Sequence, residues 1–250
     1  MGYAYMGSGK IRIAPYSTSN TYEQRAFVDV ENASIFEITL QPDEKELMDF
    51  TNPAGGTDAS VKRIKTVTGK MDLRHFTAAN LARAMWGTTT AQTATPITGE
   101  AGYKINAGGF IATKRLIDIT VAPVLKKGGT AILSADFTYS AGGVHIASTI
   151  TTPAVTSGDA ITIDYTPLLS TSAQGLQAVA PLVSIHFEGI DVNSGKQLAA
   201  KIWQAKLGSA QSLSLIGDEF GVLSLPFMAL KDSTISAATN SQFCEIQIAS

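Results

Sequence analysis

Three histidines are the side chains of this sequence best suited to hold a metal ion or to transfer a proton. His75, His145 and His186 are far apart, and none has a second histidine, cysteine or carboxylate at the spacing that metal-binding motifs use. His186 lies in an alternating run of apolar and polar residues, which is typical of a strand position that faces solvent or an interface. The sequence therefore predicts no metal site.

The sequence also lacks the motifs that are typical of an activated nucleophile or of a phosphate-binding loop. No serine stands in a G-x-S-x-G motif, and Cys244 lies beside Phe243 in the predicted terminal strand FCEIQIA, where we expect a small apolar core residue. The sequence GSGK at residues 7–10 lacks both the spacing and the following Ser or Thr of a phosphate-binding loop. Asp43, Glu44 and Glu46 lie in a polar segment, where solvated charges are expected. We therefore predict a protein that is not an enzyme and binds no cofactor.

Composition limits the classes of partner. Hydrophobic residues make up 44% of the 250 residues and charged residues 16%, which is typical of a folded chain with a sizeable core. A formal net charge of −2 disfavours a protein that holds nucleic acid by neutralising phosphates. The single cysteine excludes a disulfide within one chain. Residues 1–10 do not resemble a signal peptide, and no apolar run approaches the roughly 20 residues of a membrane helix.

Alternation of apolar and polar residues predicts strands along most of the chain. In GKIRIAP, residues 9–15, Ile11 and Ile13 share one face and the basic side chains lie on the other. Later runs such as YKINAGGFIATKR, AILSADFTYS and AITIDYTPL are separated by glycine pairs and predict consecutive hairpins. The predicted fold is mainly β, a β-sandwich or barrel. Length leaves the number of domains open, and we interpret residues 1–250 as a single domain.

Two segments interrupt the strands. Residues 78–86 follow Thr77, a candidate N-cap, and precede Gly87, so they predict one amphipathic helix that flanks the sheet. Residues 43–62 contain a short helix-like piece and strong loop residues, and they predict a long loop of a size that is usually functional or disordered. Residues 1–9 have little core-forming content and are expected to form a flexible arm.

The most informative stretch is 183–232. VSIHFEG and LAAKIWQAKL alternate at period two around an Asn-Ser-Gly turn, which predicts a hairpin. In LSLIGDEFGVLSLPFMALKD, short β-type runs are broken at Gly217 and Gly221. Nothing in this stretch has the pattern of a catalytic site.

Four segments, taken in order, resemble the major tail tube proteins of long-tailed, non-contractile (siphovirus-type) bacteriophages. They are GKIRIAPY with FVDVENASIFEITL, then KTVTGKMDLRHFTAANLARAMWG, then TAILSADFTYSAGGVHIASTITTPAVTSGDAITIDYTPL, and finally the stretch at 183–232. Each segment consists of strand and turn residues that many β proteins share, so the resemblance depends on their order.

The resemblance implies a β-sandwich or barrel flanked by a helix, whose subunits form hexameric rings stacked into a hollow tube. Sheets of neighbouring subunits would pair into one barrel, so that edge strands become the assembly interface. The implied partners are other copies of the chain and the tape-measure, tail terminator and tail tip proteins. Double-stranded DNA would pass without specific binding, through a lumen expected to be neutral or negative. The implied location is the virion tail, preceded by the host cytoplasm before assembly.

The resemblance also gives residues 43–62 a role as an assembly loop between stacked rings. Leu47, Met48 and Phe50 are apolar residues among charges, and Lys62 and Arg63 end the loop. We predict that these five residues belong to the assembly interface.

Two other functions fit the sequence. One is a non-catalytic carbohydrate-binding or adhesin module on a virion or cell surface, for which Trp86 and Trp203 are the only tryptophans available to stack on a sugar. Both are better explained as core or interface anchors. The other is the related tube of a contractile injection machine, which sequence distinguishes poorly from a non-contractile tail.

Overall fold

The computed structural model describes residues 6–51, 55–150, 152–236, 238 and 240–249. It is mainly β, and its described residues contain a single α-helix, α1 (Ala78–Ala84), which confirms the predicted fold class. The chain divides into two compact units, where the sequence had been interpreted as one domain. Unit 1 comprises Met1–Thr88 and Ala173–Ser250, and unit 2 comprises Thr89–Ser172.

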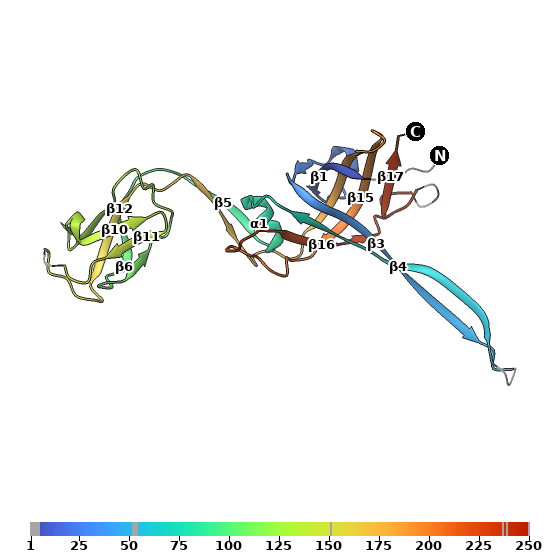
Figure 1. The fold of residues 1–250 in the computed structure, drawn as a ribbon, viewed down its shortest axis with the longest axis horizontal. Helices are drawn as coiled ribbons and strands as arrows, with labels where there is room; N and C mark the ends of the chain where they lie inside the picture. The colour runs from blue at the N-terminus through green and yellow to red at the C-terminus, as the bar shows by residue number, and fades with distance from the viewer. Residues whose placement is uncertain (1–5, 52–54, 151, 237, 239, 250) are drawn as a thin grey trace. The chain divides into compact units, whose positions relative to one another are not determined.

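Unit 1 contains an eight-stranded sheet whose order is β2-β1-β14-β15-β16-β4-β3, with β17 also paired to β15 (Figure 1). All of its strand pairs are antiparallel. A 3-10 turn, Tyr22–Gln24, precedes β2. The strands are β1 (Gly7–Pro15), β2 (Val28–Asp29), β3 (Ala33–Met48), β4 (Thr57–Leu73), β14 (Leu182–Asp191), β15 (Gln197–Leu207), β16 (Leu223–Leu230) and β17 (Cys244–Ile248).

The register of this sheet collects its apolar side chains on one face. Ile13 lies opposite Ile185, and Ile185 lies opposite Ile202, so every second residue of three strands enters one core. The sheet curves until β3 faces β14: the Phe36 ring stacks on that of Phe187 with centroids 5.4 Å apart. The core-facing side is thus closed on itself, and we call the opposite side the outer face. The buried core includes Ile11, Ile13, Met71, Leu73, Ile185, Ile202, Leu207, Leu223 and Leu225.

Helix α1 begins as predicted. The Thr77 hydroxyl accepts a hydrogen bond from the backbone N–H of Asn80 at 3.2 Å, which is the expected N-cap contact. The helix ends at Ala84, two residues before the predicted end, because Trp86 has φ of 48° and cannot continue it. The Asn80 amide donates to the carbonyl oxygen of Val30 at 3.0 Å and thereby ties the helix to the sheet.

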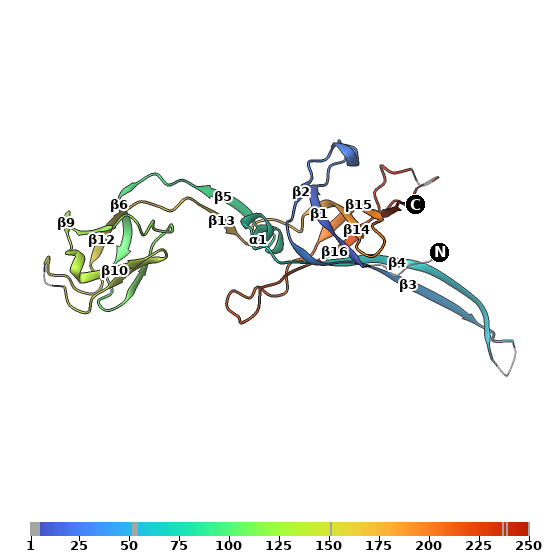
Figure 2. The same ribbon diagram turned by 45° about the horizontal axis from the view of Figure 1, so that its top comes forward.

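The predicted loop at 43–62 is instead the outer half of the β3–β4 hairpin, and its predicted helix-like piece was wrong. Asp43 lies opposite Arg63, and Glu44 lies opposite Lys62. The neighbouring strand β16 pairs with β4 only from Val67 to Leu73, so the rest of the hairpin extends past the sheet (Figures 1 and 2). Of the predicted arm at 1–9, residues 1–5 lie outside the described residues, and β1 already begins at Gly7.

The predicted hairpin at 183–207 is confirmed as β14 and β15, with Gly195 at φ of 72° in the turn. The next stretch differs from the prediction, because residues 208–222 contain no strand. They form a loop that leads into β16.

Unit 2 has two small sheets of order β6-β12-β8-β9 and β10-β11-β7 over a core of its own. The core includes Ile105, Ile111, Ile117, Leu125, Val144, Ile161 and Ile163. The strands are β6 (Ile97–Lys104), β7 (Phe110–Ala112), β8 (Val124–Lys127), β9 (Thr130–Ala131), β10 (Phe137–Ser140), β11 (Gly143–Ile146) and β12 (Ala160–Tyr165), with a 3-10 turn at Ser134–Asp136. The chain enters the unit through β5 (Thr88–Gln92) and leaves through β13 (Ser170–Gln174), which pair with each other.

Candidate assembly surfaces

All five residues predicted for the assembly interface lie on the outer half of the β3–β4 hairpin. The side chains of Leu47 and Met48 are exposed, and Phe50 exposes 88% of its surface. Lys62 and Arg63 lie across the hairpin from Glu44 and Asp43, with N–O distances of 3.4 and 3.8 Å. These exposed ion pairs stabilise the hairpin only slightly.

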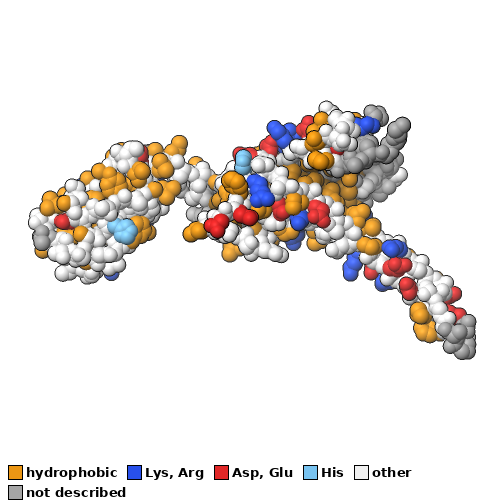
Figure 3. Space-filling model, in the orientation of Figure 1, with side chains coloured by type: hydrophobic (Ala, Val, Ile, Leu, Met, Phe, Trp, Pro, Cys, Tyr) orange, Lys and Arg blue, Asp and Glu red, His pale blue; other side chains and the backbone are white. Residues whose placement is uncertain are grey.

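The outer half of the hairpin has no core beneath it. Residues 57–65 are exposed throughout, and they include the large apolar side chains of Val61 and Ile64. An isolated two-stranded hairpin is marginally stable in water. Figure 3 shows basic, acidic and hydrophobic side chains interspersed along this arm. An arm of this kind exposes apolar surface and unshared backbone groups that a partner can cover.

The outer face of the sheet carries as many basic as acidic side chains. On the β1-β14-β15-β17 part, Arg12 pairs with Glu188 at 2.5 Å and Lys201 pairs with Glu245 at 3.4 Å. On the β16-β4-β3 part, Lys70 lies 3.9 Å from Glu37. The register places the following charged residues on this face: Lys10, Arg12, Asp29, Glu37, Lys70, Asp72, Glu188, Lys201, Lys206 and Glu245. The whole face is therefore balanced, with five basic and five acidic side chains. The β1-β14-β15-β17 part, taken with β2, carries one more basic than acidic side chain, and the β16-β4-β3 part carries one more acidic than basic.

His186 lies in the middle of this face, as the alternating pattern predicted. Its Nδ1 atom is 3.2 Å from the Tyr22 hydroxyl, which donates to the carbonyl oxygen of Ile185 at 2.9 Å. Burial lowers the pKa of His186, and the nearby charges of Arg12 and Lys201 lower it further, while Glu188 opposes them. The imidazole is therefore neutral at pH 7, and the face keeps its balance of charge.

We expect the free energy of unfolding to fall as the pH decreases from 7 to 5. The pKa of His186 is lower in the folded chain than in the unfolded one, so the unfolded state binds the proton first and gains stability. Urea unfolding at several pH values checks this, with His186→Gln as the comparison. In the variant, the free energy of unfolding should decrease less between pH 7 and pH 5 than in the wild type. Identical pH profiles in the two proteins would contradict the lowered pKa of His186.

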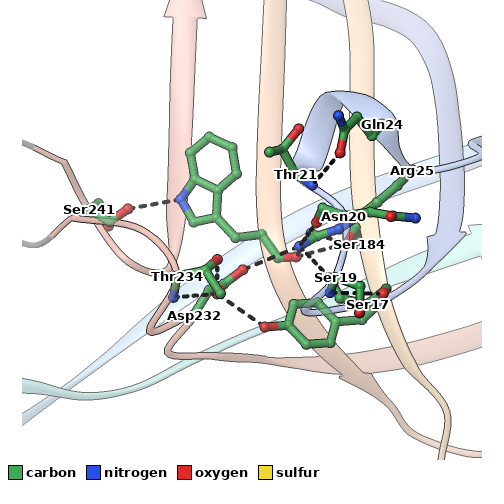
Figure 4. A network of polar contacts seen from close by, with 12 residues as sticks. Ser17, Ser19, Asn20, Thr21, Gln24, Arg25, Ser184, Asp232, Thr234 and Ser241 are labelled. Carbon is green, nitrogen blue, oxygen red and sulfur yellow. Dashed lines mark hydrogen bonds and ion pairs between the residues drawn. The ribbon is translucent and has the colours of Figure 1, made fainter.

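A buried ion pair that sequence analysis missed ties two loop segments of unit 1 to strands β14 and β15 (Figure 4). Arg25 and Asp232 expose 2% and 0% of their side chains, and Nη2 of Arg25 lies 3.6 Å from Oδ2 of Asp232. Nη1 of Arg25 also donates to Oγ of Ser184 at 2.6 Å and to the carbonyl oxygen of Trp203 at 2.8 Å. The pair thus fixes the segment before β2 and the segment after β16 against β14 and β15.

The remaining candidates for chemistry stay apart in space. Among the described residues, no group of three or more His, Cys, Asp or Glu side chains is arranged to hold a metal ion. His75 pairs with Glu31 at 2.5 Å on the surface. Cys244 packs against the core of unit 1, as predicted, and burial raises the pKa of its thiol. A half-buried thiol with a raised pKa is a poor nucleophile.

Comparison with known proteins identifies a family without a described activity. No curated protein matches the sequence. In the described part of the chain, no helix combines the length and the apolar character needed to span a membrane. A family model matches residues 4–247, which is nearly the whole chain, and the chain therefore belongs to the family described as protein of unknown function UCP028589.

Proposed function

We propose that this protein is a structural subunit of a phage tail tube, which self-assembles into stacked hexameric rings whose lumen conducts the viral genome. The observation that carries the proposal is the β3–β4 hairpin, which extends past its sheet and exposes Leu47, Phe50 and Val61 without a core of its own. Such an arm gains stability when another copy covers it. The proposal also rests on the resemblance to tail tube proteins.

The free edges of the unit 1 sheet support lateral contacts within a ring. Strand β3 ends the sheet on one side, and its outer edge has no neighbour among the described strands. On the other side, β2 pairs only with Arg12 and Ile13, which leaves much of the β1 edge uncovered. Pairing one edge with the other of the next copy is a heterologous contact, which can close into a ring. Each ring would then satisfy edges that invite aggregation in a monomer.

The charge of the outer face supports passage of DNA. A basic lining would hold phosphates, whereas a lining of balanced charge lets a duplex slide. The outer face is balanced as a whole, and its β16-β4-β3 part, with one more acidic than basic side chain, suits a lumen better than the slightly basic β1-β14-β15-β17 part. The sequence-based expectation of a neutral or negative lumen agrees with this arrangement. The partners of the tube would be the tape-measure, tail terminator and tail tip proteins, and its place would be the virion tail.

Negative-stain electron micrographs of the purified protein across a concentration series test the proposal. We expect rings at low concentration and hollow tubes of uniform diameter at high concentration, because assembly depends on contacts between copies. A protein that stays monomeric at every concentration, with and without a tail tip fraction as initiator, would overturn the tube. In that case the non-catalytic binding module would become the better explanation.

A further inference from the structure

The loop at 208–222 exposes three large apolar side chains. Leu215, Ile216 and Phe220 expose 78%, 96% and 92% of their surface. Monomeric proteins rarely gather such side chains on a surface unless it binds something. The loop therefore requires an explanation that burial in its own unit does not supply.

The base of this loop is well anchored. The backbone N–H of Gly208 donates to the carbonyl oxygen of Pro226 at 2.8 Å, and that of Ala210 donates to Ala84 at 2.9 Å. Leu213 packs against the core of unit 1. Nη1 of Arg74 donates to the carbonyl oxygen of Phe220 at 3.2 Å. The exposed side chains are thus presented on a fixed base.

Arg74 also shows where the loop lies relative to the hairpin. It directly follows β4, whose other end, Thr57, lies near the tip of the hairpin. Strand β4 has 17 residues, and at a rise of about 3.3 Å per residue it separates the two surfaces by roughly 55 Å. Figure 2 shows the hairpin and this loop at opposite ends of unit 1. They do not meet within one chain, but a second copy placed end to end would bring them together.

One face of the hairpin is complementary to the loop in charge as well as in apolar character. No carboxylate in the described part of the chain pairs with Lys45 or Lys65 on the hairpin, and no base there pairs with Asp218 or Glu219 on the loop. The hairpin also carries Glu46 and Asp58, but the register places Lys45 opposite Val61 and on the same face as Leu47, whereas Glu46 lies on the other face. The face with Lys45, Leu47 and Val61 can therefore meet the anions and exposed apolar residues of the loop. Such complementarity fixes the register and the partner of a contact.

We infer that the 208–222 loop of one copy receives the β3–β4 hairpin of a second copy. The inference rests on the proposed ring stacking and names the partner surface for the hairpin. The contact joins different surfaces on the two copies, so it leaves a free hairpin at one end of a stack and a free loop at the other. The two ends of the tube are therefore different.

Thiol cross-linking between copies tests the inference. In a Cys244→Ser background, one variant carries Ser60→Cys on the hairpin and another carries Ser214→Cys on the loop; both positions are exposed. A short bismaleimide should link the mixed variants and leave each variant alone largely unlinked. Ser148→Cys, which is exposed in unit 2, replaces the loop variant as a control and should not link to Ser60→Cys. Adding Asp218→Lys and Glu219→Lys to the loop variant should lower the yield about tenfold.

The outcomes separate this inference from the proposed function. Wild-type tubes without a mixed cross-link would overturn the hairpin–loop contact and leave the tube intact. A mixed cross-link in a protein that stops at short oligomers would support the contact and overturn the tube. Neither tubes nor a cross-link at any concentration would overturn both.

Discussion

Replacing Arg25 with methionine is expected to lower the free energy of unfolding by about 3–5 kcal/mol, because it leaves a buried carboxylate without its cation. Methionine keeps the apolar length of the side chain, so packing changes little. Asp232 would still accept hydrogen bonds from the Tyr16 hydroxyl at 3.1 Å and from the Thr234 hydroxyl at 2.6 Å. Those bonds cannot supply the lost positive charge, and the oxygens of Ser184 and Trp203 lose a donor.

Urea unfolding followed by circular dichroism measures this loss, and Arg12→Met is the matched control. Arg12 pairs with Glu188 at 2.5 Å on the surface, where breaking an ion pair costs about 0–1 kcal/mol. Equal losses in the two variants would contradict the structural role of the buried pair.

The same variant should unfold at a higher pH during acid titration. Burial alone would raise the pKa of Asp232, but hydrogen bonds from Thr234 and Tyr16 and the charge of Arg25 hold it below its ordinary value. Stability from a depressed carboxylate pKa is complete above the unfolded value and is lost as the pH falls through the folded one. Without Arg25 the folded pKa of Asp232 rises towards the unfolded value, so the variant has less of this stability at pH 7, and protonation of its other carboxylates unfolds it at a higher pH.

Period-two alternation predicted those strands that bury one face. The β14–β15 hairpin is an example, because Ile185 and Ile202 enter the core while His186 and Lys201 face outward. The outer half of the β3–β4 hairpin escaped prediction because it has no buried face. Its residues 43–46, DEKE, carry charges on both sides of the strand and favour a helix by propensity. Pairing across the hairpin, as between Asp43 and Arg63, overrides that propensity.

The division into two units and the Arg25–Asp232 pair were not predictable from the same patterns. The polar, Thr-rich stretch TTTAQTATPITG at 88–99 is typical of a surface linker and lies at the first boundary, but both units are built from short alternating strands with glycine turns, and no change in composition marks Ser172 as the second boundary. Arg25 and Asp232 meet only because β14 and β15 lie between their segments. Before the pairing of the strands is known, nothing in the sequence distinguishes Asp232 from other acidic residues in turns.

The predicted interface residues allow a direct test of the hairpin. Phe50→Asp should leave the fold of the monomer intact, because Phe50 exposes 88% of its surface and packs in no core. Burying a phenylalanine at an interface contributes about 1.5–3 kcal/mol, and burying an unpaired carboxylate there adds a further cost. Every subunit of a ring would lose this contribution, so tube growth should stop at single rings. Sedimentation and electron micrographs at matched concentrations measure this.

Leu169→Asp is the control for that experiment. Leu169 is a large apolar side chain with 75% of its surface exposed, and it belongs to unit 2, whereas the hairpin belongs to unit 1. The variant carries the same change from apolar to acidic and should form tubes as the wild type does. Tubes of Phe50→Asp with unchanged length and yield would show that the hairpin is not the contact between rings. Loss of tubes in both variants would instead indicate that added negative charge, and not the hairpin, controls growth, because repulsion between copies acts over the whole surface.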